Sequence, residues 1–62
     1  MTTTRIQIEL PDSQAWAYAQ YLKRVGLDDY RQRAVDADEA WDMQSAGEIV
    51  RRALAEKGIA PR

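Results

Sequence analysis

The chain has 62 residues, which allows one domain whose folding hides only about 60% of the unfolded surface, so a lone monomer is expected to be marginally stable. It contains no Cys and no His, which excludes disulfide bonds and the usual zinc ligands. The formal net charge is −1, whereas proteins dedicated to binding DNA usually carry a clear basic excess.

Self-association is the remaining route to stability. Chains below about 70 to 80 residues usually add disulfides, a metal or a second subunit. Since the first two are excluded, we expect a homodimer of a single domain over residues 1–62. No apolar run approaches the length of a signal-peptide core or a membrane span. We therefore expect a cytoplasmic protein that makes no contact with a membrane.

The first predicted element is a β-strand over residues 4–10. Apolar and polar residues alternate there, as Arg5, Ile6, Gln7, Ile8, Glu9 and Leu10. A period of two is typical of a strand with one buried face. Because no second strand pattern follows, its partner is expected to be the same strand of another copy or a strand of the target. The predicted dimer interface consists of Ile6, Ile8 and Leu10.

A helix is predicted over residues 12–25. Pro11 ends the strand, and Asp12 is the predicted N-cap of the helix. Apolar residues at helical spacing form its inner face, namely Ala15, Tyr18, Ala19, Leu22 and Val25. Gly26 stands where a left-handed residue commonly ends a helix.

Two further helices are predicted, a short one over 28–35 and a long one over 38–57. Tyr30 and Val35 are the expected inward anchors of the short helix. In the long segment, apolar residues recur at steps of three and four until Gly58, and the sequence alone leaves open whether the helix is continuous. The predicted fold class is α+β and mostly helical, in the order β-α-α-α.

Catalytic residues are not predicted. A nucleophilic Ser needs an adjacent base, and the chain has no His or Cys to build the usual pair. The acidic run at 36–42 has the composition of a metal site, but a calcium loop of the EF-hand type requires Gly where Trp41 stands. The glycines are isolated, so no phosphate-binding loop is present. We expect a protein that is not an enzyme and takes no metal, cofactor or small-molecule substrate.

The two tryptophans, Trp16 and Trp41, admit two interpretations. In a chain without Phe, both rings are expected to fill the helix–helix core. Trp is also enriched among the residues that anchor protein interfaces. Trp16 lies about 100° around its helix from Ala15, off the centre of the apolar face. Trp16 is therefore the better candidate for an exposed ring.

The N-terminal part resembles the ribbon-helix-helix family of bacterial and phage repressors, intertwined dimers whose paired strands enter the major groove of DNA. The resembling residues are 5–12, 25–27 and 45–54. The resemblance implies that Arg5, Gln7 and Glu9 face the bases and that the amides near Ser45 bind a phosphate at a helix N-terminus. The chain departs from the family at residues 28–44, where the family has a short turn.

Over its whole length the chain resembles a group of small, functionally uncharacterised proteins carried by bacteriophages, prophages and conjugative elements. The resembling segments are 22–26, 28–31, 34–36, 39–43 and 52–62. The resemblance implies an origin on a mobile element and implies no activity.

We therefore predict a small regulatory protein that binds and inhibits a host or element protein. Small acidic proteins of mobile elements often act in this way, and an acidic surface can imitate nucleic acid to a basic groove. The predicted protein-binding residues are Trp16, Asp28, Asp29, Asp36, Asp38, Glu39, Trp41 and Asp42. An ordinary solvated face is the alternative interpretation of this charge. A ribbon-helix-helix repressor or antitoxin that binds DNA is the alternative function, and a self-associating structural module is a third.

Overall fold

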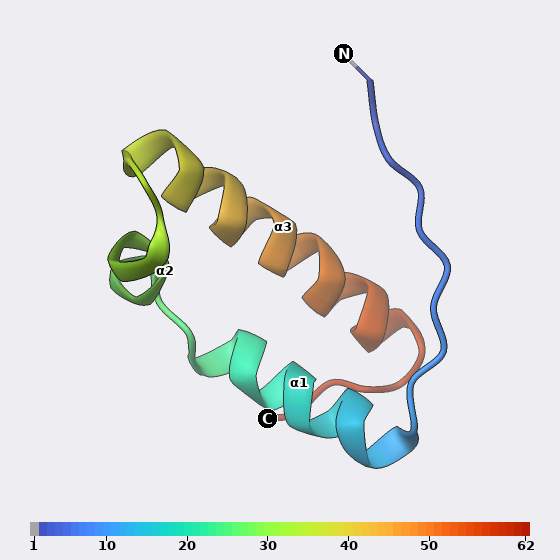
Figure 1. Cartoon of the computed structure of the whole chain (residues 1–62). Helices are drawn as coiled ribbons and strands as arrows, with labels where there is room; N and C mark the ends of the chain where they lie inside the picture. The colour runs from blue at the N-terminus through green and yellow to red at the C-terminus, as the bar shows by residue number, and fades with distance from the viewer. Residues whose placement is uncertain (1) are drawn as a thin grey trace.

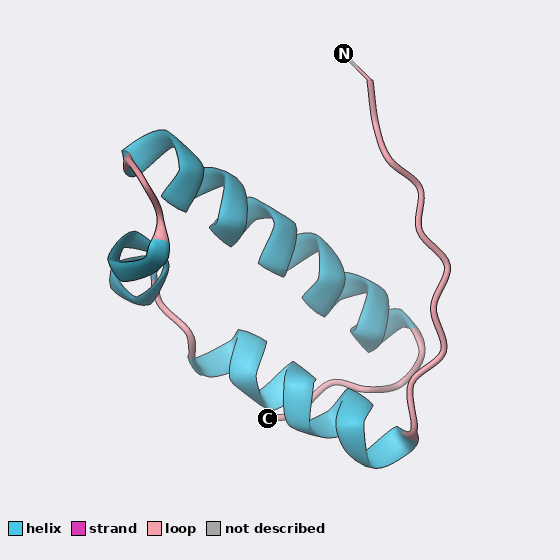
Figure 2. Cartoon of the chain, viewed as in Figure 1, coloured by secondary structure: helices cyan, strands magenta, loops and turns pink. Residues whose placement is uncertain are grey.

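The computed structural model describes residues 2–62, which form three α-helices and no β-strand (Figures 1 and 2). The helices are α1 (Asp12–Arg24), α2 (Leu27–Arg33) and α3 (Ala37–Glu56). α1 and α3 lie side by side, and α2 packs against α3 at the end where the chain passes from one to the other (Figure 1).

The helix bounds lie within two residues of the predicted ranges 12–25, 28–35 and 38–57. Helical periodicity and helix-end residues are local features of a sequence, which is why they predict these ranges. Within residues 2–62, no helix combines the length and the apolar character needed to cross a membrane.

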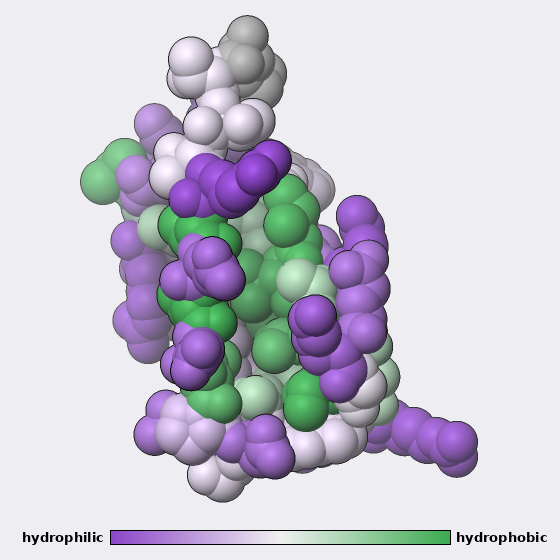
Figure 3. Space-filling view, turned by 90° about the vertical axis from the view of Figure 1, so that its right-hand side faces the viewer, coloured by the Kyte–Doolittle hydropathy of each residue, from purple (hydrophilic) through white to green (hydrophobic). Residues whose placement is uncertain are grey.

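The predicted strand over residues 4–10 is wrong, and with it the β-α-α-α, ribbon-helix-helix-like architecture. Residues 2–11 instead form an extended and exposed segment. Figure 3 shows apolar and polar side chains alternating along this segment, beside further apolar side chains of the molecule. A strand also needs the backbone hydrogen bonds of a neighbouring strand, and residues 2–62 supply none. Ile6 consequently stays 70% exposed.

α1 begins directly after Pro11, whose carbonyl accepts a hydrogen bond of 3.0 Å from the Ala15 N–H. Asp12, the predicted cap, is instead the first helical residue, where its carboxylate lies at the positive end of the helix dipole. Gly26 was expected to be left-handed, but its φ is −110° and it caps the start of α2. The break between α1 and α2 is therefore an extended link and needs no left-handed residue.

α3 runs without interruption through Ser45 and ends at Glu56, two residues before Gly58. The Gly58 N–H donates to the Ala55 carbonyl and the Ile59 N–H donates to the Leu54 carbonyl, each over 3.0 Å. This pair of bonds is the Schellman motif, which requires a left-handed residue after the helix. Gly58 has a φ of 87°, a conformation that glycine adopts without steric cost.

The core between α1 and α3 is small. The buried residues among 2–62 are Ala15, Ala19, Leu22 and Ala40. Alanine lets two helices approach closely but removes little apolar area from water. Val35, predicted to point inward, is 84% exposed because it lies in the turn between α2 and α3. The part of the chain at residues 2–62 therefore folds around a thin layer of three alanines and one leucine, and it leaves nine large apolar side chains exposed.

Candidate protein-binding surface

Helix starts use three of the predicted acidic residues as capping groups. The Asp36 carboxylate accepts a hydrogen bond of 2.8 Å from the Glu39 N–H, and the Glu39 carboxylate accepts one of 3.0 Å from the Val35 N–H. At α2, the Asp29 carboxylate accepts a hydrogen bond of 2.9 Å from the Gly26 N–H. These bonds satisfy backbone donors that a first helical turn leaves free. Asp29, Asp36 and Glu39 therefore have a structural role.

Three carboxylates of the same region, Asp28, Asp38 and Asp42, have no such partner. All three are exposed, and the one ion pair among residues 2–62 lies elsewhere, between Arg51 and Glu48 at 3.9 Å. Across the described part of the chain, no group of three acidic side chains is placed to hold a metal ion. These carboxylates therefore present uncompensated negative charge to solvent.

Both tryptophans lie on the surface, so the expectation that they fill the core is wrong. Trp16 is 43% exposed and Trp41 is 56% exposed. Trp41 follows Asp38 by three residues on α3, which places the two side chains on the same side of the helix. We call Asp38 and Trp41 the acid–tryptophan patch. An exposed indole at a surface is the type of side chain that most often anchors a protein interface.

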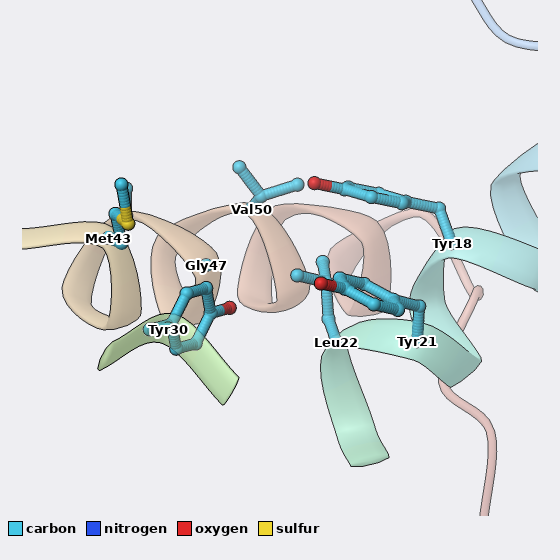
Figure 4. Close-up of a pocket in the computed structure, with 8 residues that line it drawn as sticks. Tyr18, Tyr21, Leu22, Tyr30, Met43, Gly47 and Val50 are labelled. Atoms are coloured by element: carbon cyan, nitrogen blue, oxygen red, sulfur yellow. The ribbon is translucent and has the colours of Figure 1, made fainter. Parts of the chain in front are cut away.

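A second surface, the tyrosine groove, lies where the three helices meet (Figure 4). It has a volume of about 300 Å³ and is lined by Tyr18, Tyr21, Leu22, Tyr30, Met43, Ala46, Gly47 and Val50. The rings of Tyr18 and Tyr21 stack with their centroids 5.8 Å apart and their planes at 14°. Tyr18 points toward Val50 of α3, whereas Tyr30 reaches the groove from α2. The groove is thus open, aromatic and largely apolar.

Gly47 makes room for Tyr30 in this groove. A Cβ atom added to Gly47 would lie 2.5 Å from the Tyr30 Oη and 3.4 Å from the Leu22 Cδ2. The missing side chain therefore lets the phenol ring lie directly against α3. Burial raises the pKa of the Tyr30 hydroxyl above its ordinary value, and the neighbouring Tyr21 and Tyr18 raise this pKa further. The hydroxyl consequently stays neutral at physiological pH.

One protein family matches the chain over residues 1–62, and it is described as a family of unknown function, DUF7706. The chain belongs to the DUF7706 family. No curated protein and no solved structure matches this DUF7706 chain. Membership agrees with the predicted likeness to a functionally uncharacterised group, and it supplies no activity.

The residues assigned to DNA contact do not form the predicted geometry in this DUF7706 chain. Arg5, Gln7 and Glu9 are exposed on the extended segment, without the paired ribbon that presents such side chains to base edges. Ser45 lies in the middle of α3, so no helix N-terminus is there to bind a phosphate. The predicted interface residues of the same segment, Ile6, Ile8 and Leu10, have no partner strand within residues 2–62.

The tyrosine groove was not predicted. Helical spacing assigns Tyr18 and Tyr30 to the inner faces of two helices but does not indicate that their rings converge. Two signals in the DUF7706 sequence point to the groove. Tyr18 and Tyr21 are three residues apart, and Gly47 stands inside a long helix, where close approach of another group is a common reason for glycine.

Proposed function

We propose that this DUF7706 chain is a non-catalytic regulatory protein, carried by a phage or another mobile element, that binds a basic surface of a host or element protein. The observation that carries the proposal is the acid–tryptophan patch, where an exposed indole lies beside a carboxylate that forms no ion pair among residues 2–62. The likeness of segments such as 52–62 to proteins of mobile elements supports the proposed origin.

The two side chains of the patch contribute different parts of such a contact. Trp41 still exposes 56% of its surface, which a partner can bury, so this ring supplies most of the affinity in the proposed contact. Carboxylates such as Asp38 and Asp28 attract a basic partner at long range and exclude acidic ones. Affinity then resides in one ring, and selectivity for a basic surface resides in the charges around it.

The capping carboxylates are left out of the proposed contact. Asp29, Asp36 and Glu39 each accept a backbone hydrogen bond at a helix start, and these bonds form without any partner. Reversing their charge would disturb the helices and would not report on binding. Trp16, on α1, is the second exposed indole and the alternative anchor.

The test is affinity purification of the tagged chain from its source cells, with half of each sample treated with nuclease. The variant to compare is D38K/W41A, and the matched control is E56K, which reverses an exposed charge at the other end of α3, about 27 Å away. We expect a stoichiometric protein partner that survives nuclease treatment. Calorimetry with that purified partner should show binding at least about 30-fold weaker for D38K/W41A and unchanged for E56K.

Two results would overturn the proposal. One is a protein partner that binds D38K/W41A and E56K with equal affinity, which would place the contact elsewhere. The other is capture of DNA, in the untreated half alone, with no protein partner in either half.

A further inference from the structure

The chain exposes more surface than a compact protein of its mass. Its accessible surface is 5546 Å² for 7.1 kDa, whereas a folded monomer of this mass exposes about 4,100 Å². The excess is therefore about 1,400 Å². Part of it lies on the extended segment of residues 2–11, and the rest lies on helices whose shared core holds mostly alanine.

On α3 the exposed apolar surface forms one continuous stripe. Ala46, Ile49, Val50 and Ala53 follow one another at steps that place them on the same side of the helix. Ile49 is 63% exposed, both alanines are exposed and Val50 is half-buried. We call these four residues the α3 stripe. Because Ala46 and Val50 also line the tyrosine groove, the stripe and the groove form one apolar face.

Opposite charges stand at the two ends of the α3 stripe. Asp42 lies seven residues before Ile49, and Lys57 lies seven residues after Val50. Both side chains are exposed, and neither forms an ion pair among the described residues. A two-fold axis that places Ile49 against Val50 of a second copy also places Asp42 against Lys57 of that copy. A parallel alignment would instead place Asp42 against Asp42.

We propose that a second copy of the chain covers this face, with the two α3 helices antiparallel about an axis between Ile49 and Val50. The same register places Ala46 of one copy against Ala53 of the other, and these small side chains let the helices pack closely. Each copy contributes the same surface, as in most homodimers. Tyr18, which points toward Val50, flanks the contact (Figure 4).

The size of the excess surface allows a second copy of the chain to cover this face. A standard interface buries about 800 Å² on each partner, and permanent homodimers bury more than about 1,000 Å² on each. The excess of about 1,400 Å² includes the extended segment, which this contact leaves uncovered, so it is an upper bound on the area that the helices can offer, and this bound exceeds the standard area. A net charge of −1 on each chain leaves little overall repulsion between two copies.

The proposed dimer uses a different part of α3 from the proposed protein contact. Trp41 lies about 100° around the helix from Asp42, on the side away from the stripe. Asp38 lies beyond the charged end of the stripe, four residues before Asp42. The D38K/W41A variant is therefore expected to remain dimeric. A result against the proposed protein contact would consequently leave the proposed dimer untouched, and the reverse also holds.

Engineered cysteines test the register, because the natural chain contains no Cys. Two positions seven residues apart on one helix are separated by about 10 Å along the axis, too far for a disulfide within one chain. The A46C/A53C variant should therefore form a covalent dimer under mild oxidation, visible by non-reducing electrophoresis. A46C alone should form none. Equal cross-linking of A46C alone would indicate a parallel pair and overturn the proposal. An A46C/A53C variant that is helical but stays uncross-linked under the same oxidation would also overturn it.

Charge exchange at the ends of the stripe is the second test. Sedimentation equilibrium should show the dissociation constant of the dimer rising at least about 10-fold in D42K, because two repulsive pairs replace two attractive ones. The K57E variant should behave in the same way, and D42K/K57E should regain the natural affinity. Circular dichroism checks that each variant is helical. A natural chain that stays monomeric at 100 µM, or single variants that associate as well as the natural chain, would contradict the proposal.

Discussion

Tyr30 connects the short helix α2 to the middle of α3. Its ring occupies the space that a side chain at position 47 would fill, and its hydroxyl points into the tyrosine groove near Tyr21 (Figure 4). Burial of this hydroxyl disfavours the phenolate, because a charge is less stable where water is excluded. The protonation of Tyr30 is therefore coupled to the packing of α2 on α3.

The stability of the fold should reflect this coupling at alkaline pH. The pKa of Tyr30 is raised in the folded chain, chiefly by burial, so the stability that its neutral form contributes is fully present below the unfolded pKa of about 10. That stability is lost as the pH rises through the higher pKa of the folded state. Urea unfolding between pH 8 and 11.5 should show the natural chain losing stability relative to Y30F above about pH 10. Parallel curves for the two proteins would mean that the Tyr30 hydroxyl is solvated in the fold.

At the scale of elements, helices were predictable and the strand was not. Asp36 and Glu39 stand three residues apart before an apolar repeat. In the structure Asp36 accepts a hydrogen bond from the Glu39 N–H and Glu39 accepts one from the Val35 N–H, so the signals for the start of α3 lie within a few residues. The alternation from Arg5 to Leu10 is just as regular. A strand depends on hydrogen bonds from a segment elsewhere in sequence, and residues 2–62 contain no such segment.

The candidate surface was predicted only in part, because some of its features depend on contacts between segments that are distant in the sequence. Exposure of Trp16 off the apolar face follows from helical geometry alone. The exposure of Trp41 and Tyr18 depends on how much of each helix the other two cover, and short helices with alanine contacts cover little. The sequence also does not separate the acidic residues that cap a helix, such as Asp29 and Asp36, from those left free, because all of them stand close together in the chain.

Loss of the α3 cap is expected to weaken that helix measurably. Replacement of Asp36 by Ala removes the acceptor of the Glu39 N–H and should lower the free energy of unfolding by about 1 kcal/mol. D38A is the matched control, since Asp38 carries the same charge in the first turn of α3 and accepts no capping bond. Chemical denaturation at neutral pH measures both. Equal losses for the two variants would assign the effect to the helix dipole and not to the cap.

At the scale of the whole molecule, three helices enclose a core of four buried residues while nine large apolar side chains stay exposed. Such a chain gains little from folding alone, because the entropy lost by its backbone is offset mainly by buried apolar area. If a second copy covers the apolar face as proposed, its contacts contribute to the stability of the fold itself.

The melting temperature should therefore depend on protein concentration. If two copies fold together, a hundredfold rise in concentration adds about 2.7 kcal/mol to the dimer, which corresponds to roughly 10 °C in Tm for a protein of this size. Calorimetry of the natural chain between 2 and 200 µM (roughly the accessible range) measures how Tm changes with protein concentration. D42K should melt at a lower temperature than the natural chain at each concentration, whereas W41A should show the same dependence on concentration as the natural chain. A Tm that is independent of concentration in the natural chain would mean that each copy folds alone.

The alanine-rich core also determines how the fold responds to cold. The heat capacity of unfolding arises from apolar surface that becomes hydrated, and a core of three alanines and one leucine supplies little of it. The helices of a single chain are therefore expected to lose structure gradually over a wide temperature range. Apolar association between chains weakens on cooling, because hydrophobic attraction near room temperature is entropic. In the proposed dimer, low temperature should consequently separate the two copies before it unwinds their helices.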